Sequence, residues 1–319
     1  MEAVYSDALP ALETLVDAAD EGLHPWVHSH VPAGVRRAAL EQELGFWLHT
    51  AAQDLDYARQ YAADAPQCGQ PPEAYLDRWL PLPDGGHVLA GPRYLGQDPN
   101  LPFVGVSASD RVLRPADAGA LAELARMSFA PFRPGFVMVT TADGVDGWPG
   151  VGNEKRLLVG QLGELRARET PPELTTTPCT DTRFYDRYLE IHQTQVEREP
   201  AHGRHTRAEA EADLQALVEQ RLVFDVRVDG EWAGVLAAEP DTDRGVRGAT
   251  VVELLLAPER RGRGWGRHLS VLLANALSMD DSDCLMGRIH LDNASAYRSA
   301  LAAGRVDVGG EFRIPVPSS

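Results

Sequence analysis

Hydrophobic and polar residues alternate with the period of an α-helix over two segments near the start of the chain, 6–23 and 35–63. Both segments are therefore predicted to be helices that bury one face. The face of the second segment that we expect to be buried comprises Leu40, Leu44, Trp47 and Leu48.

The pattern changes after residue 67, where proline, glycine and aspartate become frequent and short runs favour strands. The first such run covers 87–94. The pattern then predicts strand, helix, strand and helix in turn, over 103–107, 115–129, 135–141 and 154–168. The first half is thus predicted to be a small α/β domain.

Prolines mark a linker near Pro171, and a strand is predicted to follow over 173–178. A chain of 319 residues has the length of two ordinary domains. We therefore predict one domain over 1–170 and a second over 171–319.

The second half follows the order strand, two helices and three strands. The helices are predicted over 184–196 and 207–220, and the later strands over 223–228, 232–239 and 248–257. Asp229 and Gly230 predict a tight hairpin between the first two of these strands. The last strand is apolar at nearly every position, as expected of a strand that is buried on both faces.

Composition and charge exclude several classes of protein. Hydrophobic residues make up 44% and charged residues 24%, as in globular proteins rather than disordered or fibrous ones. The net charge of -17 would repel nucleic acids and anionic lipid surfaces. The N-terminus lacks the basic start of a secretory signal, and no apolar run approaches the roughly 20 residues of a membrane helix, so we expect a cytoplasmic protein without a membrane partner. Cys68, Cys179 and Cys284 are far apart and odd in number, which predicts free thiols.

The apolar strand 248–257 runs into a turn rich in glycine and arginine, and a helix is predicted over 268–277. The residues of the turn are Arg261, Gly262, Arg263, Gly264, Trp265, Gly266 and Arg267. Glycines let backbone N–H groups come close to an anion, and the start of a helix adds partial positive charge, so a diphosphate would fit at this turn. The spacing matches neither the P-loop nor the Rossmann fingerprint. The alternative is a tight strand-to-helix connection with solubilising arginines.

This turn resembles motif A of the GNAT superfamily of acyl-CoA-dependent N-acyltransferases, whose signature is Q/R-x-x-G-x-G/A. The matching residues are Arg261, Gly264 and Gly266. Downstream, a predicted strand over 285–291 is followed by Asn293 and a helix that ends at Gly304, which resembles motif B. The resemblance covers residues 173–314 and implies the GNAT fold, an α/β (α+β) fold in which a mixed, mostly antiparallel central sheet is flanked by helices.

The resemblance implies that the protein binds coenzyme A, with acetyl-CoA as cosubstrate. The residues that it assigns to the coenzyme are Leu254, Leu255, Leu256, Arg261, Gly262, Arg263, Gly264, Trp265, Gly266, Arg267 and Asn293. In the family, the amides of the turn hold the pyrophosphate, and the strand before the turn pairs with pantetheine while one amide polarises the thioester carbonyl. Asn293 would touch pantetheine, although its position is explained equally well by a helix N-cap.

One position departs from the family pattern. The tyrosine that often serves as general acid would fall at Ala300, and Tyr297, one turn earlier, is the nearest phenol. Direct attack by an amine needs a base, while the acid is dispensable. Candidates for the base are Glu253, a carboxylate in a mostly apolar strand, and His290 on the next strand. The alternatives are an ion pair of Glu253 with an arginine, a satisfied core position for His290, and a core or surface position for Tyr297.

Histidines outside the motifs form two groups. The first comprises His192, His202 and His205, and the second His24, His28 and His30. The first group lies in or after the first helix of the second half, where the family gathers acceptor-binding residues, so its members are candidates for the acceptor pocket. The second group lacks a cysteine or carboxylate spacing that would complete a metal site, so we expect a surface loop and no metal.

The first half lacks the R-x-x-G-x-G signature, yet its predicted order of strands and helices resembles a GNAT core. The chain thus resembles a tandem GNAT protein with a degenerate first copy, whose register stays open because residues 110–117 also resemble the first GNAT strand and helix. We expect this half to bind no coenzyme and to shape the acceptor cleft.

Three functions remain open at this point. The first is acetyl transfer from acetyl-CoA to a primary amine of a small molecule, favoured for a cationic acceptor by the acidic surface. The second is another acyl-CoA reaction, such as malonyl-CoA decarboxylation or transfer of a longer acyl chain. The third is a non-catalytic protein that binds coenzyme A. No pattern in the sequence indicates the oligomeric state.

Overall fold

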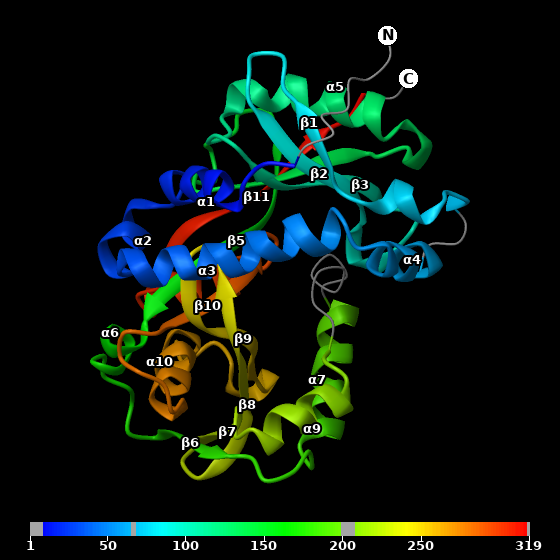
Figure 1. The fold of residues 1–319 in the computed structure, drawn as a ribbon. Helices are drawn as coiled ribbons and strands as arrows, with labels where there is room; N and C mark the ends of the chain where they lie inside the picture. The colour runs from blue at the N-terminus through cyan, green and yellow to red at the C-terminus, as the bar shows by residue number, and fades with distance from the viewer. Residues whose placement is uncertain (1–8, 65–67, 199–207, 318–319) are drawn as a thin grey trace. The chain divides into compact units, whose positions relative to one another are not determined.

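The computed structural model describes residues 9–64, 68–198 and 208–317, and its fold is drawn in Figure 1. The chain forms two compact units. Among the described residues, unit 1 comprises those up to Glu154, Asp243–Val246 and those from Val308 onward, and unit 2 comprises Lys155–Thr242 and Arg247–Asp307. The first division between the units therefore falls before the boundary predicted after residue 170, and the end of the chain belongs to unit 1.

The helices and strands divide between the units according to where most of their residues lie. Unit 1 contains α1 (Leu12–Glu21), α2 (Pro25–His30), α3 (Ala33–Phe46), α4 (Leu55–Asp64), β1 (Arg78–Pro81), β2 (His87–Tyr94), β3 (Pro102–Ser109), α5 (Ala118–Ser128), β4 (Phe136–Thr141) and β11 (Val306–Pro315). Unit 2 contains β5 (Gly152–Gln161), α6 (Leu162–Arg166), β6 (Leu174–Pro178), α7 (Tyr185–Arg198), α9 (Glu211–Glu219), β7 (Val223–Val228), β8 (Glu231–Asp243), β9 (Val246–Leu256), α10 (Gly266–Ala276), β10 (Cys284–His290) and α11 (Ala294–Ala302).

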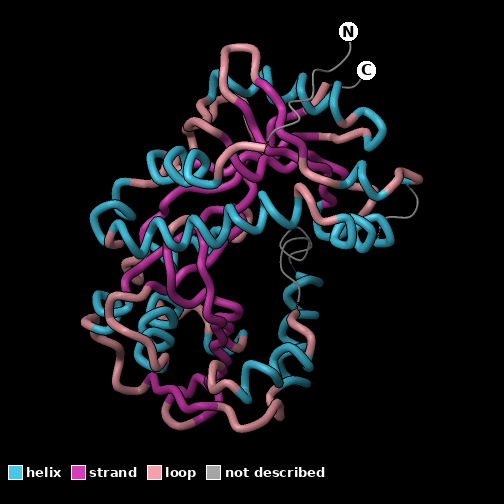
Figure 2. The backbone as a smooth tube through the Cα atoms, in the orientation of Figure 1, coloured by secondary structure: helices cyan, strands magenta, loops and turns pink. Residues whose placement is uncertain are grey.

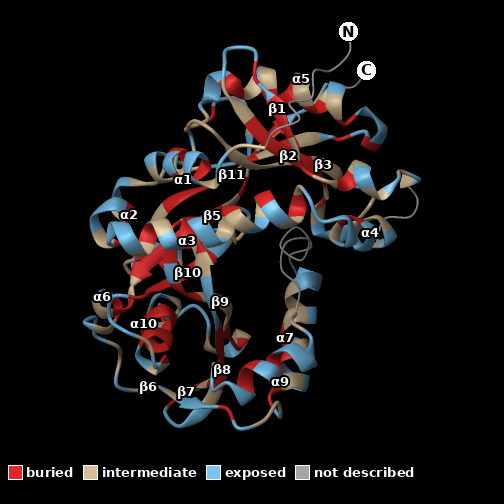
Figure 3. Cartoon of the chain, viewed as in Figure 1, coloured by how far each residue is buried: buried red, intermediate tan, exposed pale blue. Residues whose placement is uncertain are grey.

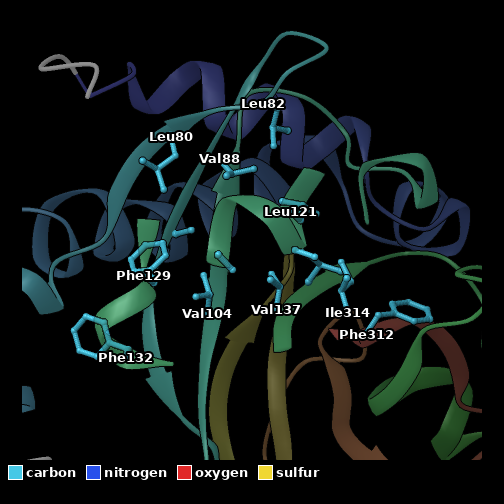
Figure 4. Close-up of a cluster of buried hydrophobic side chains, with 14 of the residues drawn as sticks. Leu80, Leu82, Val88, Val104, Leu121, Phe129, Phe132, Val137, Phe312 and Ile314 are labelled. Atoms are coloured by element: carbon cyan, nitrogen blue, oxygen red, sulfur yellow. The ribbon is translucent and has the colours of Figure 1, made fainter. Parts of the chain in front are cut away.

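Unit 1 is built on a sheet in the order β1-β2-β3-β4-β11. Its neighbouring strands are antiparallel except for β3 and β4, which pair in parallel. On one face, Leu121 of α5 packs into a core with Val104, Val137 and Phe312 (Figure 4). Phe312 lies on β11, so the last strand of the chain completes both the sheet and the core of unit 1.

The long helix predicted over 35–63 is interrupted. It ends as α3 at Phe46, a π-helical segment of 5 residues follows over Trp47–Ala51, and α4 begins at Leu55. Asp54 starts the new helix because its side chain accepts hydrogen bonds from two backbone N–H groups of the first turn. In the predicted stripe, Leu40, Leu44 and Leu48 are buried and Trp47 packs against them while partly buried. The helix predicted over 6–23 is α1, and its predicted residues 6–8 lie outside the described residues.

Unit 2 is built on a sheet in the order β6-β7-β8-β9-β10-β5. β7 pairs antiparallel with β6 and β8, β10 pairs antiparallel with β5, and β9 and β10 pair in parallel. Asp229 and Gly230 form the predicted hairpin turn between β7 and β8, with φ angles of 52° and 82°. The predicted fold class, a mixed and mostly antiparallel sheet flanked by helices, is confirmed.

The helix predicted over 154–168 is wrong, because most of this segment is the strand β5, and only Leu162–Arg166 are helical. Leu157, Leu158 and Val159 are completely or almost completely buried, which requires apolar contacts on both faces of the strand. The apolar run alone does not distinguish such a strand from a buried helix, and the pairing with β10 decides it.

Helices cover both faces of the unit 2 sheet, with the strand layer between them (Figure 2). On one face, Leu273 of α10 and Leu162 of α6 share a core with Leu256. On the other face, Tyr188 of α7 shares a core with Leu255. Neighbouring residues of a strand point to opposite faces, so the end of β9 contributes to both cores. Figure 3 shows the resulting burial of β8 in the middle of this sheet.

The predictions about membrane helices and free thiols concern the whole chain, and the described residues bear on both. Among them, no helix is long enough and apolar enough to cross a membrane. Cys68, Cys179 and Cys284 are free thiols, as predicted. Burial raises the pKa of both Cys179 and Cys284 to about 12, so these two thiols stay protonated at neutral pH.

Candidate functional site

The first feature of the site is the end of the pairing between β9 and β10. Their parallel register joins Gly248–Thr250 to Cys284–Met286, and both strands then continue beyond it. A Cβ atom at Gly248 would lie 1.8 Å from the Cys284 carbonyl oxygen, so only glycine permits this close approach. The following segment of β9, Val251–Leu256, is outside that register, and it contains the three leucines that the resemblance assigns to pantetheine and the thioester.

The second feature is the turn between β9 and α10. Gly262 and Gly264 have φ angles of 77° and 78°, and a Cβ atom at either would meet nothing within 4 Å. These positions therefore favour glycine because the backbone is left-handed there, and not because a side chain would clash with its neighbours. The turn is exposed, while Trp265 at the start of α10 is buried and anchors it. The exposed turn therefore lies directly before the N-terminus of an eleven-residue helix, where backbone N–H groups lack partners within the helix.

The three arginines of the turn have different roles. Arg261 donates from Nε to the Leu256 carbonyl oxygen at 2.8 Å and from Nη2 to Gln195 Oε1 at 3.2 Å, so its side chain braces the turn against β9 and α7. Arg263 and Arg267 are exposed, and Arg263 lies over the Trp265 ring, 5.3 Å from its centroid. These two guanidinium groups supply positive charge beside the turn.

The motif B residues are where the sequence predicts them. Asn293 caps α11, since its Oδ1 accepts a hydrogen bond of 3.1 Å from the Ala296 N–H group, and Gly304 follows the helix with a φ of 94°. A Cβ atom at Gly266 would lie 2.9 Å from Ser299 Oγ, so α10 and α11 are packed closely. The capping role of Asn293 is thus observed, and its contact with pantetheine stays a prediction.

Among the described residues, Glu253 pairs with a histidine and not with the arginine of the structural alternative. Its Oε2 lies 3.0 Å from His192 Nε2, and its Oε1 accepts a hydrogen bond of 2.9 Å from the Leu254 N–H group. Both side chains are mostly buried but reachable, with 15% of Glu253 and 13% of His192 exposed. The structure thus brings together Glu253, a candidate base, and His192, a candidate residue of the acceptor pocket. The N–H group of Leu254 is already hydrogen-bonded to the Glu253 carboxylate.

Two residues that the sequence did not single out surround this pair. The Tyr188 ring packs edge-on against the His192 ring at 4.5 Å, and the Tyr188 hydroxyl accepts a hydrogen bond of 2.9 Å from the Glu209 N–H group. Burial, and next the charge of Glu253, raise the pKa of both Tyr188 and Glu209. Glu209 and Glu253 are thus near neighbours beside His192.

The helical spacing of polar residues on α7 is the sequence pattern from which Tyr188 could have been found. Tyr188, His192 and Gln195 are four and three residues apart on α7, so they share a face of the helix. The other two candidates of that group, His202 and His205, lie outside the described residues.

The remaining catalytic candidates belong to other hydrogen-bond networks. Tyr297 donates to Asp307 Oδ2 at 2.7 Å, and Arg156 holds the same carboxylate. Burial, and next Asp307, raise the pKa of Tyr297 to about 12. His290 Nδ1 accepts a hydrogen bond of 3.1 Å from the Asp292 N–H group. Their predicted catalytic roles have no support from these contacts.

The histidines near the N-terminus have structural contacts. His24 caps α2 by accepting a hydrogen bond of 3.1 Å from the Trp26 N–H group, and the His30 ring stacks on the Trp26 ring at 4.3 Å. Within the described part of the chain, no group of three or more His, Cys, Asp or Glu side chains is arranged to hold a metal ion.

Unit 1 also contains a strand, a connection and a helix in β3, α5 and the residues between them. Asp117 at the start of this helix accepts a hydrogen bond of 2.7 Å from the Arg114 N–H group, and Arg111 pairs with Asp117 and Asp84. A carboxylate of the chain thus lies at the N-terminus of α5. That the first half binds no coenzyme stays a prediction.

Comparisons with known proteins gave matches only among solved structures. No family model matches the chain, and no curated protein matches it. A GCN5-related N-acetyltransferase from Sphaerobacter thermophilus is 13% identical with a TM-score of 0.47, covering 82% of this chain and 92% of that chain. One from Kribbella flavida is 15% identical with a TM-score of 0.43, covering 82% and 96%. A tandem GNAT protein from the clavulanic acid biosynthesis pathway is 13% identical with a TM-score of 0.44, covering 97% and 94%.

These identities and TM-scores are too low to transfer an activity or a residue role to this chain. The strand order of unit 2, the parallel pair that ends at Thr250 and Met286, and the turn at Gly264 come from the chain itself. These features agree with the fold that the motifs of unit 2 imply.

Proposed function

We propose that the protein is an acyl-CoA-dependent N-acyltransferase that transfers an acetyl group from acetyl-CoA to the primary amine of a small cationic molecule. The observation that supports this most is the sequence β9, glycine turn and α10, in which a strand segment outside the β10 register leads into an exposed turn at a helix N-terminus. A diphosphate on the turn would direct the attached pantetheine arm along the end of β9.

The residues present fit such a ligand. The amides from Arg261 to Gly266 would hold the pyrophosphate, with Arg263 and Arg267 beside it. The segment Leu254–Leu256 would pair with pantetheine, and one of its amides would stabilise the oxyanion that forms at the thioester carbonyl.

The chemistry is direct attack on the thioester. The neutral amine forms a C–N bond to the carbonyl carbon, the C–S bond breaks, and the amine proton ends on the leaving sulfur. Glu253 and Glu209 would attract an ammonium group and lie next to a histidine that can exchange protons. This supports an acceptor with a positive charge.

The test of coenzyme binding is a pair of glycine substitutions. Gly264→Val places a branched side chain at a φ of 78°, and Gly150→Val does so at 76° at an exposed position of unit 1. Both variants should lose stability, since a left-handed backbone costs about 1–2 kcal/mol for a residue with a Cβ. Only Gly264→Val should lose acetyl-CoA binding in calorimetry. Equal affinity of both variants for acetyl-CoA would reject this site.

A turnover assay separates the remaining functions. The protein is incubated with acetyl-CoA or malonyl-CoA and a panel of amines, while free thiol and released CO2 are measured. Thiol release that depends on both acetyl-CoA and an amine supports the proposal. CO2 release from malonyl-CoA without an amine would favour decarboxylation, and binding without any turnover would favour a coenzyme-binding protein.

A further inference from the structure

The contacts around Glu253 assign the proton transfer to a different residue. We propose that His192 is the catalytic residue that takes the proton from the attacking amine and returns it to the leaving thiolate, while Glu253 is a positioning residue. This inference rests on the acyl transfer proposed above and names the group that handles its proton.

Glu253 is poorly placed to be the base itself. One carboxylate oxygen accepts the N–H group of Leu254 at 2.9 Å, and the other lies 3.0 Å from His192 Nε2. Both oxygens of this carboxylate thus have a partner within the protein, and the partner of the second is the imidazole itself. Its geometry is that of a group that orients an imidazole.

His192 has the features that a proton carrier needs. A neutral imidazole that donates from Nε2 to a carboxylate keeps a lone pair on Nδ1, so Nδ1 is the basic atom. The ring is held on one side by Glu253 and on its edge by Tyr188, and 13% of the side chain is exposed. The imidazole is thus oriented but still reachable.

The other candidate acids and bases are engaged elsewhere. Tyr297 gives its hydroxyl proton to the hydrogen bond with Asp307, which Arg156 also holds. His290 Nδ1 accepts the Asp292 N–H group. The family position for the acid is Ala300, which is buried and has no proton to give.

One imidazole can supply both proton transfers. The amine nitrogen bonds to the thioester carbon while its N–H proton moves to His192 Nδ1, which gives a tetrahedral oxyanion and an imidazolium. The C–S bond then breaks, the oxyanion re-forms a carbonyl, and the imidazolium protonates the thiolate. Glu253 stays ionised throughout and stabilises the imidazolium, and no further reactant is needed.

Three polar groups among the described residues face the imidazole. They are Glu253 on β9, Tyr188 on α7 and Glu209 before α9. The imidazole must be neutral to accept a proton, and the amine must be neutral to attack, so turnover should rise with pH.

The experiment uses the full chain with acetyl-CoA and the best amine from the panel. His192→Ala and His192→Gln should keep acetyl-CoA affinity and lose kcat by roughly 10²- to 10⁴-fold, the usual contribution of a positioned acid or base. Added imidazole should partly restore His192→Ala. Glu253→Gln should lose less kcat than either, and added imidazole should not restore it because His192 is still present. Glu190→Gln changes an exposed carboxylate of the same helix, which pairs with Arg187, and should keep wild-type kcat.

Two results would overturn the assignment. The first is near-normal kcat in both His192 variants, and the second is a larger loss of kcat in Glu253→Gln than in His192→Gln. These outcomes differ from a failure of the proposed function, which would appear as wild-type protein that neither binds acetyl-CoA nor releases thiol.

Discussion

The strand β5 gives the sharpest test of how the chain divides into folding units. From the sequence, residues 173–319 would form a complete second domain. In the structure, the unit 2 sheet also contains β5, which precedes that range. We therefore compare two fragments, 173–319, which lacks β5 and α6, and 150–319, which contains both.

The loss of folding free energy in the shorter fragment can be estimated from the buried residues that it lacks. These are Leu157, Leu158, Val159, Leu162 and Leu165, each at most 1% exposed. Burial of one such side chain contributes about 1.5–3 kcal/mol, so five contribute roughly 8–15 kcal/mol. The total stability of a domain is about 5–15 kcal/mol. The shorter fragment should therefore not fold.

Loss of β5 has two further costs. The strand β10 loses its antiparallel partner and becomes an exposed sheet edge. The buried guanidinium of Arg305 loses the Leu158 carbonyl oxygen, to which it donates at 2.7 Å and 3.2 Å. An uncompensated buried charge destabilises a fold strongly.

Urea unfolding followed by tryptophan fluorescence and circular dichroism measures the difference. Trp232 and Trp265 are present in both fragments, so the same probes report on each. The longer fragment should unfold cooperatively, and the shorter one should show no cooperative transition. A cooperative transition of 173–319 at the urea midpoint of 150–319 would show that β5 is dispensable and would refute the reasoning.

Two further predictions concern buried polar groups. Burial lowers the pKa of Arg305 to about 10, and its guanidinium donates to the backbone carbonyls of Leu158 and Gly287. Arg305→Met should therefore destabilise the protein less than Arg156→Met, which leaves the Asp307 carboxylate without its guanidinium partner and should cost about 3–5 kcal/mol. Urea unfolding of both variants measures the difference, and the reverse order of stability would contradict this account. Burial raises the pKa of the Cys284 thiol from 9.0 to about 12, so the unfolded chain loses this proton at lower pH than the folded chain. The free energy of unfolding should therefore fall as the pH rises from 9 to 12. Cys284→Ala should make this fall less steep in unfolding measured at several pH values, and an unchanged slope would contradict the prediction.

The sequence by itself determined most of the site's local structure. Glycines at 262 and 264 allow a left-handed backbone that other residues resist, so the turn could be located from residue type alone. The apolar run of β9 and the hairpin at Asp229 and Gly230 are likewise local signals, and both were predicted correctly. The order of such signals, together with the motif resemblance, predicted the mixed, mostly antiparallel sheet of unit 2.

Only the tertiary structure decided which partners these elements have. Residues 154–168 were predicted as a helix because a short apolar run fits a buried helix or a buried strand, and pairing with β10 selects the strand. The sequence likewise showed that Glu253 needs a partner without showing that His192, 61 residues earlier, supplies it. Contacts of this kind depend on how the chain closes over long separations, which local periodicity and residue type do not record.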